Sequence, residues 1–74
     1  MASLGNAHIT FIGGGTMAEA LVRGILGRRL AAPGQITVSE PLAERRTQLA
    51  EALGVVVADE NAEAVRGADI VVLA

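Results

Sequence analysis

A glycine-rich run near the start of the chain has the residue types and spacing of a ligand-binding turn. Three glycines, residues 13–15, open a G-x-G-x-x-A spacing that closes at Ala18. Gly13 permits a tight turn, and Gly15 has no Cβ, so the backbone there can come close to phosphate oxygens. Ala18 is small enough for a following helix to lie close to the preceding strand. The first N–H groups of that helix and the positive end of its dipole then face the anion, so the run predicts a pyrophosphate site.

The sequence on either side of the run favours a dinucleotide as the source of that pyrophosphate. Residues 8–12 are β-prone, and a segment with the apolar spacing of a helix follows the glycines. Glu40 ends a second strand-like run, residues 36–39, close to the distance at which a ribose-binding carboxylate is expected. A flexible turn between a strand and a helix is the alternative for the glycines taken alone.

Strands and helices are predicted to alternate along the chain. We predict strands over residues 8–12, 36–39, 55–57 and 70–74, and helices over residues 16–29, 41–53 and 61–66. Pro41 suits the first position of the second helix, Gly54 the position just past its end, and Asn61 the N-cap of the third. Such alternation requires right-handed crossovers and a parallel sheet. The predicted fold class is therefore α/β, the first half of a Rossmann-type three-layer parallel sheet, with the fourth strand beside the first.

Composition and charge argue against several other classes of protein. The 74 residues suffice for one small domain, and a hydrophobic content of 51% is typical of a globular protein. The net charge of −2 gives no electrostatic reason to bind nucleic acid or an anionic membrane. With no cysteine and one histidine, neither a disulfide framework nor a metal site is expected. We find no signal peptide and no apolar run near the roughly 20 residues of a membrane-spanning helix, so we expect a cytoplasmic protein.

Several polar residues admit two interpretations. Glu40 can accept both ribose hydroxyls of NADH and repel the 2′-phosphate of NADPH, or it can be a solvated acid at a helix start. Arg45 and Arg46 can turn toward a 2′-phosphate, although an exposed helix face is the favoured interpretation. Asn61 can contact a ligand or cap a helix, and Met17 can pack under the first helix. No residue is a convincing general acid or base, so no catalytic residue is predicted.

Three segments of the chain, in this order, resemble one enzyme family. Residues 9–21 resemble the opening of pyrroline-5-carboxylate reductase. So do residues 38–41 with the following residues 44–46, and residues 61–65 leading to residues 68–74. The resemblance implies the cofactor-binding part of an oxidoreductase that reduces 1-pyrroline-5-carboxylate to L-proline, the last step of proline biosynthesis, with NADPH or NADH.

The resemblance also implies, position by position, which residues bind the cofactor. Residues 12–17 would wrap the pyrophosphate. Ser39 and Glu40 would meet the adenosine ribose, Asn61 would contact the adenosine side, and Ala74 would begin the loop beside the nicotinamide. The complete implied set is Ile12, Gly13, Gly14, Gly15, Thr16, Met17, Ser39, Glu40, Asn61 and Ala74.

The resemblance further implies parts that these 74 residues do not contain. In the family, a second, helical domain forms the dimer and completes the substrate site. We therefore expect a flexible N-terminus over residues 1–7 and an NAD(P)-binding domain over residues 8–74 of a longer, homo-oligomeric parent. The 74 residues alone are expected to be inactive. The chain departs from many relatives at Thr16, where they have Asn or Gln, so a side-chain amide contact is lost there while backbone contacts remain.

Two other functions stay open at this point. A β-hydroxyacid dehydrogenase has a similar first domain, but it usually reads Gly-Leu-Gly-x-Met-Gly and has an Asn-Arg pair after the second strand. The corresponding positions here are residues 13–18 and 39–41, which favours the reductase. A non-catalytic nucleotide-binding module is also compatible with the sequence.

Overall fold

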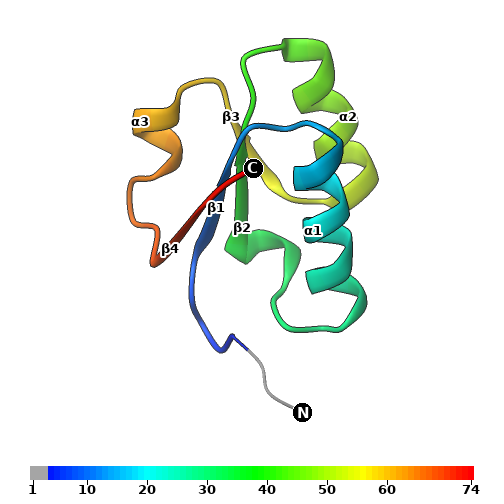
Figure 1. Ribbon diagram of the computed structural model, residues 1–74, viewed down its shortest axis with the longest axis vertical. Helices are drawn as coiled ribbons and strands as arrows, with labels where there is room; N and C mark the ends of the chain where they lie inside the picture. Colours follow the sequence, from blue (N-terminus) through cyan, green and yellow to red (C-terminus); the bar gives the residue numbers. More distant parts are fainter. Residues whose placement is uncertain (1–3) are drawn as a thin grey trace.

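The computed structural model of the chain describes residues 4–74, in which strands and helices alternate. The elements are β1 (Ile9–Ile12), α1 (Thr16–Gly27), the short 3₁₀ helix η1 (Pro33–Gln35), β2 (Ile36–Ser39), α2 (Ala43–Leu53), β3 (Val56–Ala58), α3 (Asn61–Ala64) and β4 (Ile70–Leu73). All neighbouring strands are parallel, in the order β3-β2-β1-β4. Helices α1 and α2 lie on one side of the sheet and α3 lies on the other (Figure 1). The predicted Rossmann-type α/β fold is confirmed, including the fourth strand beside the first.

Alternation along the first strand separates the two faces of the sheet. Ile9 and Phe11 are 2% and 1% exposed and belong to the apolar core shared with α1 and α2. Thr10, between them, points to the opposite face, where its Oγ1 donates a hydrogen bond of 2.7 Å to the carbonyl oxygen of Ala64 in α3. Successive side chains of a strand point to opposite faces, so β1 shares the apolar core with α1 and α2 on one face of the sheet and contacts α3 on the other.

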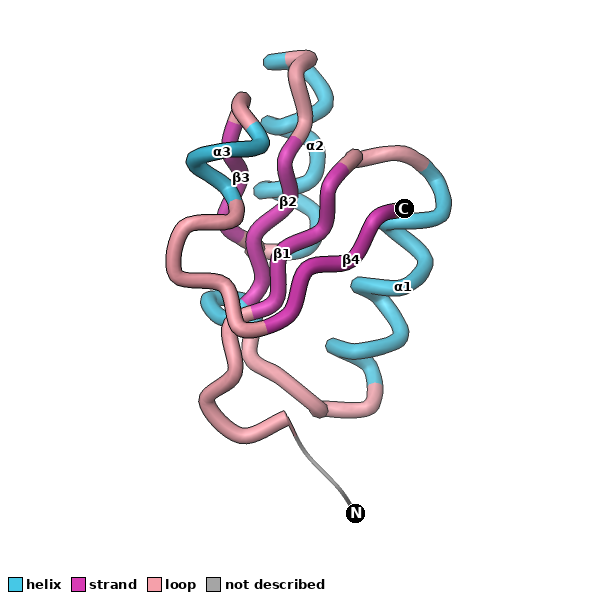
Figure 2. Tube along the Cα trace, turned by 60° about the vertical axis from the view of Figure 1, so that its left-hand side comes forward, coloured by secondary structure: helices cyan, strands magenta, loops and turns pink. Residues whose placement is uncertain are grey.

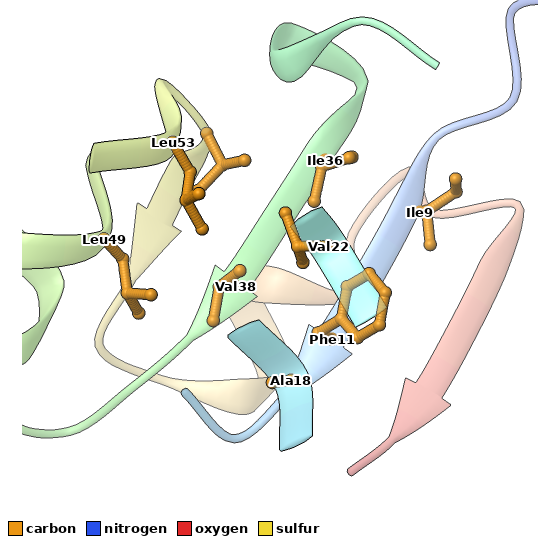
Figure 3. Packing of buried hydrophobic residues seen from close by; sticks show 9 residues of the cluster. Ile9, Phe11, Ala18, Val22, Ile36, Val38, Leu49 and Leu53 are labelled. Carbon is orange, nitrogen blue, oxygen red and sulfur yellow. The ribbon is translucent and has the colours of Figure 1, made fainter. Parts of the chain in front are cut away.

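The core lies between the sheet and the pair α1 and α2, and most of it is shown in Figure 3. Its buried members are Ile9, Phe11, Ala18, Val22, Ile36, Val38, Leu49, Leu53 and Val55. Each of the two long helices contributes two residues four positions apart, the spacing that places side chains on one face of a helix. Phe11 is the only aromatic residue of the chain, so the rest of this core is aliphatic.

The register of the sheet brings the carboxyl ends of three strands together. Ile12, the last residue of β1, pairs with Ser39 of β2 and with Leu73 of β4. The connections after β1 and β2 therefore start at the edge where β4 also ends. Figure 2 shows that β1 and β4 end on the same side of the sheet. The backbone links continue beyond the strands, because Gly13 N–H donates to the Ser39 carbonyl at 2.9 Å and Ala74 N–H to the Ile12 carbonyl at 3.3 Å.

The predicted end of the first helix was wrong by two residues. Helix α1 ends at Gly27, and Arg29 adopts a left-handed conformation with φ 55°. The N–H of Leu30 donates to the Ile25 carbonyl, and the N–H of Arg29 donates to the Leu26 carbonyl. This is the hydrogen-bond pattern of a Schellman motif, which terminates a helix and is most often built on glycine. After α1 an arginine, Arg29, occupies the left-handed position. The sequence therefore had no glycine at that position to indicate where the helix ends.

The predicted start of the second helix and the predicted N-cap of the third helix also need correction. Helix α2 begins at Ala43, so Pro41 precedes the helix instead of opening it, whereas Gly54 does end it, with φ 71°. The Glu40 carboxylate accepts the N–H of Leu42 at 2.9 Å and holds the chain in a turn before the helix. Helix α3 is one turn with Glu60 at its N-cap position, so Asn61 is its first residue and not its cap.

Two smaller differences concern exposure and the chain start. Strand β3 begins at Val56, one residue later than predicted, and Leu42, directly before α2, is 66% exposed. Of the predicted flexible terminus, residues 1–3 lie outside the described residues. Within the remainder, Leu4 N–H donates to the Leu30 carbonyl, and the Gln35 side chain donates to the carbonyls of Gly5 and Ala7. Over residues 4–74, none of the helices has the length and apolarity needed to cross a membrane.

Candidate dinucleotide site

The glycine turn after β1 begins at a position that favours glycine. Gly13 has φ +103°, a conformation that residues with a Cβ rarely adopt. A Cβ at this position would also lie 3.3 Å from the carbonyl oxygen of Ala74. The predicted role of Gly13 in a tight turn is therefore confirmed, and Ala74 lies against that turn.

Gly14 is a packing position. A Cβ on Gly14 would lie 2.9 Å from both the Glu40 Oε1 and the Leu49 Cδ1 atoms, closer than such atoms can approach. The N–H of Gly14 donates to Glu40 Oε1 at 3.2 Å. The absence of a side chain at Gly14 thus lets Glu40 and helix α2 pack directly against the turn.

Gly15 leaves open space at the start of α1. A Cβ there would meet no atom of residues 4–74 within 4 Å, apart from its chain neighbours. Gly15 is the N-cap residue and has no side chain to accept a hydrogen bond from the first turn of the helix. The N–H groups of that turn lack partners within the helix and carry its positive dipole end. This arrangement fits a phosphate group that approaches the backbone of Gly15.

The two residues after Gly15 are accessible. Thr16 and Met17 are exposed, Met17 to 67%. The interpretation of Met17 as packing under the helix is therefore wrong. Ile12 is half-buried at the end of β1, on the other side of the turn.

Glu40 is not a solvated acid at a helix start. Its side chain belongs to a residue that is only 8% exposed, and its two carboxylate oxygens accept the N–H groups of Gly14 and Leu42. A carboxylate has about four lone-pair positions, so two acceptor positions remain for a ligand hydroxyl. Glu40 therefore both shapes the turn and offers acceptors beside it.

Arg45 and Arg46 do not form an exposed helix face. Arg45 Nε donates to the Gly14 carbonyl at 2.7 Å, and its Nη2 donates to Glu19 Oε1 at 2.7 Å. Arg46 Nη1 donates to the carbonyl oxygens of Glu40 and Pro41. Both arginines are half-buried. Arg45 binds atoms of the glycine turn and α1, and Arg46 binds backbone atoms of the segment before α2. Arg45 thus turns toward the glycine turn, and Arg46 turns toward the segment that precedes α2.

Glu19 is the acidic partner in this cluster. It pairs with Arg45 across the two helices and with Arg23 one turn along α1, at 2.7 and 2.9 Å. Hydrogen bonds from Arg45 and then from Arg23 lower the pKa of Glu19 below its ordinary value. Glu19 therefore stays anionic at neutral pH and keeps Arg45 extended across the turn.

Ser39 and Asn61 meet on the α3 side of the sheet. Ser39 is 1% exposed, and its hydroxyl donates to the Asn61 side-chain oxygen. This contact uses the side chain that was expected to cap α3. The structure thus brings Ser39 and Asn61 together, apart from the cleft beside Gly15.

A cleft of about 540 Å³ opens between the glycine turn and the start of α2. Its lining residues are Gly14, Gly15, Glu40, Leu42, Ala43, Glu44, Arg45 and Gln48. This volume is within the range of small-molecule sites. The sequence interpretation missed four of these lining residues as site residues: Leu42, Ala43, Glu44 and Gln48. Among residues 4–74, no group of three or more histidine, cysteine or acidic side chains is arranged to hold a metal.

Comparison with known proteins places this geometry in a family. Residues 8–74 match the family described as NADP oxidoreductase, coenzyme F420-dependent. A pyrroline-5-carboxylate reductase of Pseudomonas aeruginosa is 44% identical over 66 residues, which are 89% of this chain and 24% of that protein. A pyrroline-5-carboxylate reductase of Synechocystis sp. is 38% identical over 67 residues, 90% of this chain and 25% of that protein.

A solved structure agrees with the sequence comparison. The structure of a pyrroline-5-carboxylate reductase from Coxiella burnetii superposes with a TM-score of 0.86 at 35% identity, over 93% of this chain and 25% of that one. The chain thus spans about a quarter of the length of the relatives it matches. Fold, turn geometry and family match agree: the chain belongs to the NADP oxidoreductase, coenzyme F420-dependent family and is an NAD(P)-binding Rossmann-type domain of it.

Proposed function

We propose that this chain is the cofactor-binding domain of a pyrroline-5-carboxylate reductase, which reduces 1-pyrroline-5-carboxylate to L-proline with NADPH or NADH. The observation that carries the proposal is the 44% identity, over 89% of this chain, to a protein named for that activity. The open backbone at Gly15 and the cleft beside Glu40 support it, because they suit the pyrophosphate and ribose of a dinucleotide.

The residues of this chain would bind and orient the cofactor. The first turn of α1 would hold the pyrophosphate, with Gly15, Thr16 and Met17 nearest to it. Glu40 would accept ribose hydroxyls with the lone pairs that the turn leaves over. When bound, the reduced nicotinamide supplies the hydride, and the protein supplies position and electrostatics.

Ile12 and Ala74 would lie toward the nicotinamide, because Ile12 ends β1, Ala74 follows β4, and both strands end at the edge where the turn lies. Ser39 and Asn61 would contribute the adenosine side from the α3 face. Gly13 and Gly14 would shape the turn beneath the phosphates. No residue of this chain is proposed as catalytic. The substrate site would come from the remainder of a longer, homo-oligomeric parent. We propose that this parent is a cytoplasmic protein.

The test is turnover by the full-length gene product. We expect 1-pyrroline-5-carboxylate to drive oxidation of NADPH or NADH, followed by absorbance at the reduced nicotinamide band, with L-proline detected as the product. Each cofactor without substrate serves as the control, together with a β-hydroxyacid and oxidised cofactor.

Each outcome of this assay separates the candidate functions. Formation of L-proline supports the proposal. Turnover of the β-hydroxyacid instead would favour the dehydrogenase reading, and cofactor binding without turnover of either substrate would favour a nucleotide-binding module.

A further inference from the structure

Both backbone polar groups of Gly14, in the glycine turn, are held by side chains from the far side of the cleft. The N–H of Gly14 donates to Glu40, at the end of β2, and the carbonyl of Gly14 accepts from Arg45, in α2. These partners are 26 and 31 residues away in sequence. The glycine turn is therefore tied to the β2–α2 connection by two charge-assisted hydrogen bonds.

The contact with Arg45 determines where the next donor points. The peptide bonds among residues 4–74 are all trans, and in a trans peptide the C=O and the following N–H point in opposite directions. Because Arg45 holds the Gly14 carbonyl on its own side, the Gly15 N–H must point away from Arg45. Gly15 is the residue whose surroundings are open, at the start of α1.

The guanidinium is itself held in place. Its Nη2 binds Glu19, and Glu19 also binds Arg23, so the Arg45 fork spans from α1 to the turn. The side chains of Arg45 and Glu19 are 27% and 28% exposed. A planar guanidinium with two partners at fixed angles restrains the carbonyl more than a single donor would.

We propose that Arg45 is a positioning residue for the cofactor: it fixes the Gly15 N–H in the direction of the pyrophosphate by holding the Gly14 carbonyl. The inference rests on the proposed binding of NAD(P)H at this turn. It differs from a contact of Arg45 with the 2′-phosphate of NADPH, because the pyrophosphate is common to both cofactors. Arg45 as a positioning residue must affect NADH and NADPH equally.

The experiment compares Arg45→Gln with Arg23→Gln in the full-length gene product. Both substitutions remove one positive charge and one ion pair to Glu19, but only the first removes a contact with Gly14. Calorimetric titration with NADH and with NADPH gives the two dissociation constants for each variant. We expect Arg45→Gln to weaken both by about tenfold, and Arg23→Gln to leave both within about twofold.

A second readout needs no ligand. In ¹H–¹⁵N spectra of the ligand-free protein, Arg45→Gln is expected to shift the amide resonance of Gly15, whereas Arg23→Gln is not. Thermal unfolding of both variants checks that the fold is intact. If Arg45→Gln does not fold, Arg45→Lys replaces it, because lysine keeps the charge but cannot hold Gly14 and Glu19 with one planar fork.

The outcomes separate this inference from the function on which it rests. Equal losses for NADH and NADPH with a shifted Gly15 amide support it. A loss confined to NADPH, no loss, or equal losses in the Arg45 and Arg23 variants would overturn it while leaving the proposed function standing. Absence of binding of either cofactor to the unsubstituted protein would overturn both.

Discussion

Three adjacent glycines in this domain differ in backbone conformation and in surroundings, and these differences give each one a different role. Gly13 carries a positive φ, Gly14 makes room for Glu40 and Leu49, and Gly15 leaves the start of α1 open. Substitutions at the three positions are therefore expected to affect different properties, either the stability of the fold or the binding of the cofactor. This is testable because folding and binding can be measured separately.

We predict that Gly14→Ala destabilises the fold, whereas Gly15→Val abolishes cofactor binding in a folded protein. The Cβ at residue 14 would be overpacked against Leu49 and Glu40, at a cost of about 1–3 kcal/mol in the free energy of unfolding. The side chain at residue 15 has room, so the cost there should stay within about 1 kcal/mol. Urea unfolding and titration with NADPH measure the two effects. Undiminished affinity in Gly15→Val would show that the phosphate does not approach this turn.

At the scale of elements, the three α-helices pack against the sheet through different kinds of contact. Helices α1 and α2 each bury two apolar residues, whereas α3 is a single turn that buries Ala64 and makes two polar contacts with the sheet. Apolar spacing in the sequence therefore predicted the first two helices well. Their ends were less predictable, because Arg29 takes a left-handed conformation that glycine usually takes, and because the Glu40 carboxylate holds a turn before α2.

Two glycines in or beside the long helices should respond in opposite ways to alanine. Gly54 ends α2 with φ +71°, so Gly54→Ala should lower the free energy of unfolding by about 1 kcal/mol. Gly24 lies within α1 and a Cβ there would meet no described atom within 4 Å, so Gly24→Ala should raise it by about 0.5–1 kcal/mol. Chemical denaturation of both variants checks the signs. A stabilised Gly54→Ala variant would contradict the helix end described here.

At the scale of the whole molecule, one small sheet positions every part of the site. The parallel register aligns the ends of β1, β2 and β4, and the core behind them is aliphatic apart from Phe11. A domain of this length is expected to have a stability of only about 4–11 kcal/mol. The geometry of the turn therefore depends on a core with little stability in reserve.

We expect Phe11→Ala to remove about 3–5 kcal/mol of stability, because it leaves a cavity where a ring was 1% exposed. Val56→Ala, at a position that is 48% exposed on an edge strand, should cost less than about 1 kcal/mol. Circular dichroism during urea unfolding compares the two. Similar losses for both variants would mean that Phe11 does not centre the core.

Local sequence patterns predicted the order of the strands and α-helices, the parallel sheet and the position of the glycine turn. These follow from local properties: apolar periodicity, residues that favour turns, and glycines where the backbone must bend or leave space. Packing of the assembled domain was needed to show that Glu40 and Arg45 bind the N–H and the carbonyl of Gly14, that Ser39 binds Asn61, and that a cleft opens beside Leu42. These contacts join residues 22 to 31 positions apart, and their side-chain directions depend on how β2 and α2 pack against the turn. No local pattern encodes such directions, because they arise only when the sheet is assembled.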